Sequence, residues 1–204
     1  VFRGEPVPAD IDDFRGLIAM GGPMGVHDQD EYPHVADEMR LIQSALKRER
    51  PVLGVCLGSQ LLAAVLGARV FRGKRKEIGW FDVTLQNVAA SDPVWSPGYA
   101  QAQRLMPLHW HGDVFELPAG AVSLAASDRT PCQAFVHGRA AYGILFHMEV
   151  TVRAVADMTA VFQQELSLEG LDGAAIRADA DVHLPGVHRV GRSVFTQWVA
   201  PTSL

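Results

Sequence analysis

The hydrophobic positions of this chain follow two patterns, one typical of buried strands and one typical of amphipathic helices. Residues 16–20 (GLIAM) and 52–55 (VLGV) are short continuous apolar runs, as in strands buried within a parallel sheet. Residues 33–48 instead carry apolar side chains near helical spacing with charges between them, and residues 151–166 are also expected to be helical. Strands and helices in this alternation predict an α/β fold with a mostly parallel central sheet flanked by helices.

The later part of the chain predicts a smaller antiparallel section beside that sheet. Residues 79–85 alternate between apolar and polar side chains, as a half-exposed strand does. A Pro- and Gly-containing loop is expected at 91–103, and one or two helices over 172–198. Further strands are expected at residues 69–71, 105–109, 122–126, 133–136 and 142–146. No repeat or linker interrupts the pattern, so we expect one domain over residues 1–204, with residues 1–4 ending a strand.

Composition narrows the class of protein without identifying it. With 48% hydrophobic and 20% charged residues, the chain resembles an ordinary globular protein. Its net charge of −5 argues against nucleic acid as a partner, and the one basic cluster, residues 72–76, is expected in a solvated loop. There is no apolar run long enough to cross a membrane and no signal-peptide pattern, so a cytoplasmic location without membrane attachment is expected.

Residues 51–67 (PVLGVCLGSQLLAAVLG) combine a strand, a tight turn and a helix around one cysteine. The strand at 52–55 is followed by Cys56, and the helix is expected to begin at Gly58. A nucleophile at such a tip is the elbow arrangement of hydrolases. The positive end of the helix dipole favours a thiolate there, and the N–H of Leu57 can face an oxyanion. The alternative is a buried structural cysteine, which would not need glycine on both sides.

His147 and Glu149 supply a second group of catalytic type. Two residues apart on an expected strand, their side chains would project to the same side. A carboxylate beside an imidazole accepts its Nδ1–H, holds the ring and stabilises the imidazolium. Taken alone, one histidine among eight is more often a packed or surface residue. Its pairing with Glu149, in a chain that also carries Cys56 at an elbow, favours catalysis.

The two motifs together resemble those of the class I, triad-type glutamine amidotransferases. GVCLGSQ at residues 54–60 is similar to the family's nucleophile motif, and the order Cys…His-x-Glu is similar to its triad. The resemblance implies a flavodoxin-like α/β fold with Cys56 as nucleophile, His147 as base and Glu149 as its orienter. The family usually has Gln and Pro where this chain has Leu145 and Met148. It also has a first strand and helix, which would precede residue 1.

The same resemblance implies an oxyanion site and a substrate clamp. The glycine-rich loop at residues 21–25 can present backbone N–H groups to an anion, although a plain turn is the alternative. The resemblance places one oxyanion amide at Gly22 in that loop and the other at Leu57. It also assigns contacts with the glutamine substrate to Gln60, His111, Gly112 and Asp113.

A competing interpretation takes His109 and His111 as two metal ligands on one face of a strand. No further ligand at suitable spacing is evident in the sequence, so no metal and no cofactor are expected. Cys132, after Pro131, is expected to be a packing residue.

The resemblance implies a cysteine amidase that hydrolyses the γ-amide of glutamine, in a stand-alone branch similar to GMP synthase. The chain has no P-loop and no room for an ATP-using synthetase, so a synthetase subunit is the expected acceptor of the ammonia. Two alternatives remain. One is a γ-glutamyl peptidase with the same triad, and the other is a catalytically silent binding or regulatory module of the same fold.

Overall fold

The computed structural model describes residues 5–200, which belong to two compact units. The first unit contains the chain up to Lys76 together with Trp110–Phe146, and the second contains Glu77–His109 and the chain from His147 onward. Residues 1–4, expected to end a strand, lie outside the described residues. The expectation of one domain over the whole chain stays a prediction.

The first unit is built on a mixed sheet. Its strands are neighbours in the order β1 (Leu17–Ala19), β2 (Val52–Val55), β9 (Ala141–Ile144), β8 (Ala134–His137) and β7 (Ala121–Ala126). The first three strands of this order are parallel, and β9, β8 and β7 are antiparallel. This arrangement confirms the expected α/β class with an antiparallel section.

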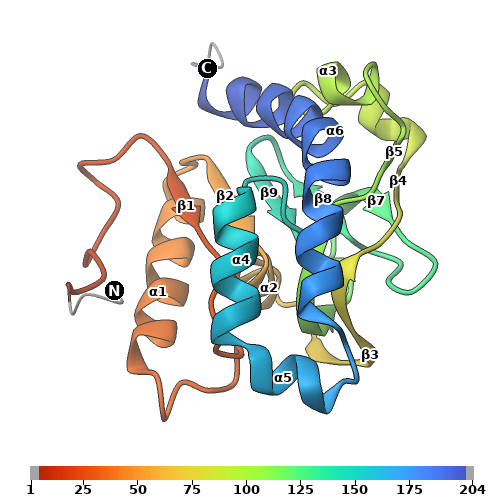
Figure 1. The fold of residues 1–204 in the computed structure, drawn as a ribbon. Helices are drawn as coiled ribbons and strands as arrows, with labels where there is room; N and C mark the ends of the chain where they lie inside the picture. Colours follow the sequence, from red (N-terminus) through yellow and green to blue (C-terminus); the bar gives the residue numbers. More distant parts are fainter. Residues whose placement is uncertain (1–4, 201–204) are drawn as a thin grey trace. The chain divides into compact units, whose positions relative to one another are not determined.

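Two helices pack against the parallel strands of the first unit, α1 (Pro33–Lys47) and α2 (Leu57–Val65). Figure 1 shows α1 running alongside β1. Pro33 suits the first turn of α1, where its missing N–H would have had no partner within the helix. The core of the unit joins the buried side of α1 to α2 and β2 through residues such as Val35, Ile42, Val52, Leu61 and Leu62.

The edge strand β1 is less buried than its sequence indicates. Ile18 is 48% exposed and Met20 is 46% exposed, whereas every residue of β2 is buried. A continuous apolar run predicts burial on both faces, but β1 is paired on one side only, with β2. The prediction of a fully buried strand at residues 16–20 is therefore wrong at Ile18 and Met20.

The basic cluster at residues 72–76 lies within a strand, not in the expected loop. It belongs to β3 (Val70–Trp80), which pairs with β6 (Leu108–Phe115) as a two-stranded sheet. Lysine and arginine are unusual in strands, but a two-stranded sheet leaves side chains open to solvent. The strand expected at 79–85 is divided accordingly: β3 ends at Trp80, and β4 (Val83–Leu85) follows.

The second unit is mainly helical. Its short strands β4 and β5 (Arg104–Leu105) are antiparallel, and a 3₁₀ turn, η1 (Asn87–Ala90), follows β4. Its helices are α3 (Ser96–Tyr99), α4 (Val152–Val161), α5 (Gln163–Leu168) and α6 (Gly173–Val199). The loop expected at 91–103 therefore contains a short helix, and Trp95 at its start is fully buried.

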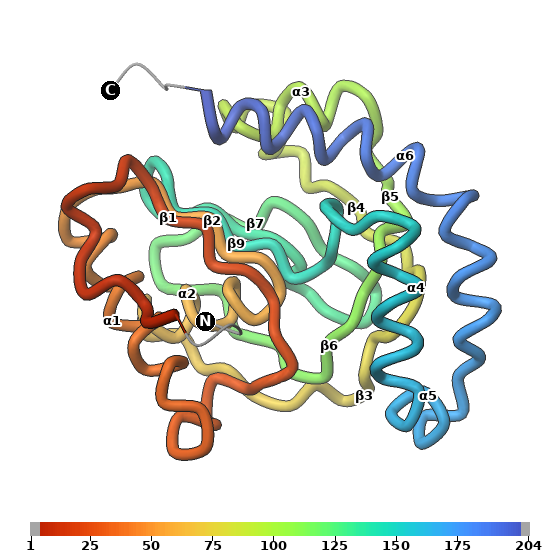
Figure 2. Tube along the Cα trace, turned by 60° about the vertical axis from the view of Figure 1, so that its left-hand side comes forward, coloured from red at the N-terminus to blue at the C-terminus, as the bar shows by residue number. Residues whose placement is uncertain are grey.

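One long helix, α6, organises the second unit. It packs against α3 and α4, and Gly98 of α3 lies so close to Val190 that an added Cβ would be 3.0 Å from its Cγ1. Figure 2 shows α6 changing direction partway along, and Pro185 lies inside it. No helix among the described residues is long and apolar enough to span a bilayer.

Candidate active site

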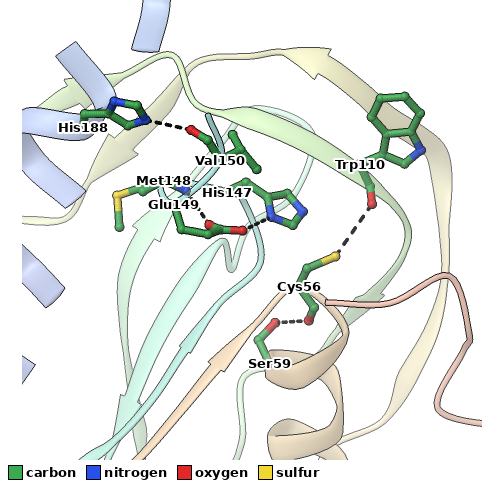
Figure 3. A network of polar contacts seen from close by, with 8 residues as sticks. All are labelled: Cys56, Ser59, Trp110, His147, Met148, Glu149, Val150 and His188. Atoms are coloured by element: carbon green, nitrogen blue, oxygen red, sulfur yellow. Dashed lines mark hydrogen bonds and ion pairs between the residues drawn. The ribbon is translucent and has the colours of Figure 1, made fainter. Parts of the chain in front are cut away.

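Cys56 lies at the sharp turn between β2 and α2. Its backbone has φ 52° and ψ −113°, a left-handed conformation that is strained for a residue other than glycine. The Cys56 N–H donates to the Ile144 carbonyl at 2.8 Å, which fixes the turn to the end of β9. The thiol Sγ lies 3.7 Å from the Trp110 carbonyl oxygen, and the Ser59 hydroxyl donates to the Cys56 carbonyl at 2.6 Å (Figure 3). Strained positions of this kind occur at catalytic nucleophiles.

Two glycines allow the turn to be this tight. A Cβ on Gly54 would lie 2.4 Å from the Gly58 carbonyl oxygen, so β2 and the first turn of α2 approach at backbone distance. A Cβ on Gly58 would lie 1.9 Å from the Ala19 carbonyl oxygen at the end of β1. Both distances are impossible for a real Cβ, so only glycine fits at either position.

The glycine-rich loop contacts the elbow. A Cβ on Gly22 would lie 3.3 Å from the Leu57 Cδ2 and 3.1 Å from the Met24 Cε. Leu57 is the first residue of α2, and the first N–H groups of a helix have no partner within that helix. The structure thus brings together, within one unit, the two residues expected to carry the oxyanion amides.

Gln60 and Asp113 also meet within the first unit. Gln60 is buried, and its side-chain Nε2 donates to the backbone carbonyl of Asp113 at 3.0 Å. The amide nitrogen of Gln60 is therefore engaged by the protein. His111, Gly112 and Asp113 are consecutive residues of β6, so His111 and Asp113 share one face of the strand and Gly112 does not. The assignment of these four residues to a substrate clamp stays a prediction.

His147 and Glu149 form a close pair in the second unit. The His147 Nδ1 lies 2.6 Å from the Glu149 Oε1, and the two side chains are 8% and 26% exposed. The backbone differs from the expected strand, because β9 ends at Ile144 and His147 forms only an isolated antiparallel bridge, with Leu108. There the His147 N–H donates to the Leu108 carbonyl at 2.8 Å. The expected pairing is present, but on an irregular segment.

The ionisation of Glu149 suits a partner for an imidazolium. Burial by itself would raise the pKa of this carboxyl group. The hydrogen bond and charge of His147, with backbone N–H groups that include that of Met148, outweigh burial and hold the pKa of Glu149 below its usual range. The Met148 N–H donates to Oε2 at 3.0 Å, a contact that proline at this position would lack.

The predicted triad draws on both units. Cys56 belongs to the first unit, and His147 and Glu149 belong to the second. The sequence alone predicted the His147–Glu149 pair because its members are close in the chain. The sequence contained no signal for two further hydrogen bonds. One runs from the Met148 N–H to the Glu149 carboxylate, and the other joins His188 to the Val150 carbonyl, 38 residues away. The joining of Cys56 with His147 stays a prediction.

The metal alternative rested on His109 and His111. Both histidines are buried, and so is the carboxylate of Glu77, a residue type that zinc also accepts. Glu77 and His109 belong to the second unit and His111 to the first. Zinc analysis of protein purified without added metal tests this alternative, and about one zinc per chain would favour it.

Comparison with known proteins adds an independent line of observation. The profile of the family "Glutamine amidotransferase class-I" matches residues 5–164. The glutamine amidotransferase-like protein YfeJ of Salmonella typhimurium is 36% identical over 170 residues, which cover 82% of this chain and 70% of YfeJ. A glutamine-hydrolysing GMP synthase of Synechocystis is 37% identical over 145 residues, which cover 67% of this chain but only 23% of that enzyme.

Solved structures agree with the sequence matches. A glutamine amidotransferase from Thermotoga maritima superposes with a TM-score of 0.85 at 33% identity, over 97% of this chain and 84% of that one. A glutamine amidotransferase from Methylobacillus flagellatus gives a TM-score of 0.84 at 31% identity, over 97% and 81% of the two chains.

Proposed function

Because the chain belongs to the class I glutamine amidotransferase family, we propose that it hydrolyses the γ-amide of glutamine through a thioester on Cys56. The observation that carries this proposal is the strained elbow at Cys56, with φ 52° at the start of α2. A packed structural cysteine has no need of that backbone conformation. The His147–Glu149 pair, at 2.6 Å, supports it as the base and its orienter.

In the proposed first half-reaction, His147 takes the thiol proton and the Cys56 sulfur attacks the γ-carbonyl carbon. With Nδ1 directed at Glu149, the proton would go to Nε2. The amides of Leu57 and Gly22 are proposed to stabilise the oxyanion. His147 then gives the proton to the departing nitrogen, the C–N bond breaks, and ammonia leaves. This scheme requires Cys56 and His147 to come within hydrogen-bond reach when glutamine is bound.

The second half-reaction returns the enzyme to its starting state. Water, deprotonated by His147, attacks the γ-glutamyl thioester, the C–S bond breaks, His147 returns the proton to the Cys56 sulfur, and glutamate is released. We propose that Gln60 and the 111–113 segment hold the α-amino and α-carboxylate groups. The GMP synthases matched by this chain are named as glutamine-hydrolysing, and the matched part is about a quarter of their length. We propose a synthetase as the acceptor of the ammonia, in the cytoplasm.

A matched pair of cysteine variants tests the mechanism. We expect Cys56→Ala to lose at least about a thousandfold in ammonia release from glutamine, as nucleophile removal does in other triads. Cys132→Ala is the control, because Cys132 is buried and belongs to the core of the same unit. Ammonia release by Cys56→Ala at the unaltered rate would end the covalent mechanism.

A substrate panel tests the proposed clamp and separates the alternatives. Asparagine and N-acetylglutamine should fail, the first because its carbonyl falls short of Cys56 and the second because polar groups of the site stay unpaired. Turnover of γ-glutamylcysteine with loss of its peptide bond would identify a γ-glutamyl peptidase. No turnover of any γ-glutamyl compound would leave the silent module as the better interpretation.

A further inference from the structure

The four residues from His147 to Val150 are held in place by the C-terminal helix α6. The imidazole Nε2 of His188 lies 2.7 Å from the backbone oxygen of Val150, the residue after Glu149 (Figure 3). A carbonyl oxygen only accepts, so His188 donates the Nε2–H. Both residues belong to the second unit. The contact therefore fastens the C-terminal end of the segment to a helix that is 27 residues long.

A second contact fastens the middle of the segment to the same face of α6. Gly191 lies three residues after His188, which puts the two on one side of the helix. A Cβ on Gly191 would lie 2.9 Å from the Met148 Cβ and 3.2 Å from the Met148 oxygen. The helix thus approaches the segment at a distance that only glycine permits. The same face of α6 therefore contacts the segment twice, through the hydrogen bond of His188 to Val150 and through the close packing of Gly191 on Met148.

The backbone of the segment in turn holds the Glu149 carboxylate. Oε2 accepts the Met148 N–H at 3.0 Å, and Oε1 faces the His147 Nδ1 at 2.6 Å. A shift of residues 148–150 relative to His147 therefore changes the contact between Oε1 and the His147 Nδ1.

From these contacts we propose that His188 and Gly191 are positioning residues that make α6 the support of the Glu149 carboxylate. The effect of these residues on catalysis rests on the proposed function. Their effect on the position of the Glu149 carboxylate does not. A role limited to the stability of α6 would change unfolding without changing the ionisation of Glu149. The two roles therefore predict different measurements.

The experiment compares His188→Leu, His188→Gln and Gly191→Ala with the unaltered chain. Carbon-13 NMR of labelled glutamate measures the pKa of Glu149, and steady-state ammonia release from glutamine gives kcat and KM. In His188→Leu we expect the pKa of Glu149 to rise and kcat to fall about tenfold, a modest cost for a misplaced group. KM should change little. His188→Gln keeps an N–H donor without a titratable ring, so it should recover most of both values.

Gly191→Ala tests the same support by crowding Met148 with an added Cβ, whereas His188→Leu removes a hydrogen bond. We expect it to raise the pKa of Glu149 and lower kcat in the same direction. If His188→Leu fails to fold, by circular dichroism, this variant and His188→Gln still decide the proposal. Arg189→Leu is the matched control, an exposed neighbour on α6 that should change neither value.

An unchanged Glu149 pKa with unchanged kcat in both His188→Leu and Gly191→Ala would overturn the proposal. Equal losses in Arg189→Leu would overturn it too, because they would indicate a general effect of α6. If the unaltered chain released no ammonia from glutamine, the proposed function would fail instead. The pKa of Glu149 would still decide whether α6 supports the carboxylate.

Discussion

At the scale of single residues, the two cysteines occupy contrasting positions. Cys56 sits at the start of a helix with its sulfur toward a backbone oxygen at 3.7 Å. Cys132 lies in the apolar core of the first unit, where burial raises its pKa to about 11. At neutral pH the Cys132 thiol is therefore protonated, and only thiolates react rapidly with alkylating reagents.

The cysteines should consequently differ in alkylation. We expect iodoacetamide near pH 7 to modify Cys56 at least about tenfold faster than Cys132, because a pKa near 11 leaves little thiolate at Cys132. Peptide mass spectrometry over a time course measures both rates in one sample. Equal slow labelling would argue against an activated Cys56.

Glu149 should matter for turnover more than for binding. Replacing it by glutamine keeps the shape but removes the charge that stabilises a His147 imidazolium. The corresponding change in a serine triad costs about 10⁴ in kcat, and a thiol, which ionises more easily, should lose less. We expect Glu149→Gln to lower kcat by about 10² to 10³ with KM within a fewfold. Unchanged kcat would remove Glu149 from the site.

At the scale of elements, close backbone contacts decide where the site can form. The elbow needs β1, β2 and α2 within touching distance, which Gly54 and Gly58 permit. Such glycines are recognisable in the sequence because they flank the cysteine. Gly191 likewise permits close contact between α6 and Met148, but no neighbouring residue in the sequence indicates this contact.

Two glycine-to-alanine changes should have opposite effects on stability. In Gly58→Ala the new Cβ would meet the Ala19 carbonyl at 1.9 Å, so β1 or α2 must move, and we expect a loss of about 2–4 kcal/mol in the free energy of unfolding. Gly186 lies inside α6 with nothing within 4 Å of its added Cβ, so Gly186→Ala should gain about 0.5–1 kcal/mol. Denaturant unfolding measures both. A tolerated alanine at position 58 would contradict the described elbow.

At the scale of the whole molecule, the sequence predicted best what depends on neighbours in the chain. The elbow, the His147–Glu149 pair and the main helices all follow from local pattern. The middle of β3, residues 72–78, was missed because its polar side chains fit a loop as well as a two-stranded sheet, and only pairing with β6 decides between them. The support from His188 was missed because it joins residues 38 positions apart.

The free energy of unfolding should depend on pH through the ionisation of Glu149. Its pKa is lower in the folded chain than the ordinary value of 4.5, so the folded state binds this proton less readily than the unfolded state does. The stabilisation is present above the unfolded pKa and is lost as the pH falls through the folded pKa. We expect unaltered protein and Glu149→Gln to differ in unfolding free energy at pH 6–7 and to converge as the pH falls below 4.5 and through the folded pKa. A constant difference at all pH values would contradict this assignment.

The left-handed backbone at Cys56 has one more consequence: the residue that is best for fold stability at this position is not the one that carries a thiol. An L-residue with φ 52° costs about 1–2 kcal/mol relative to glycine, which adopts that conformation freely. Cys56→Gly should therefore melt at a higher temperature than Cys56→Ala, although both lack the thiol. Selection for thermal robustness alone would favour glycine over cysteine at this position. Under the proposed mechanism, cysteine is retained at this position for its reaction with glutamine.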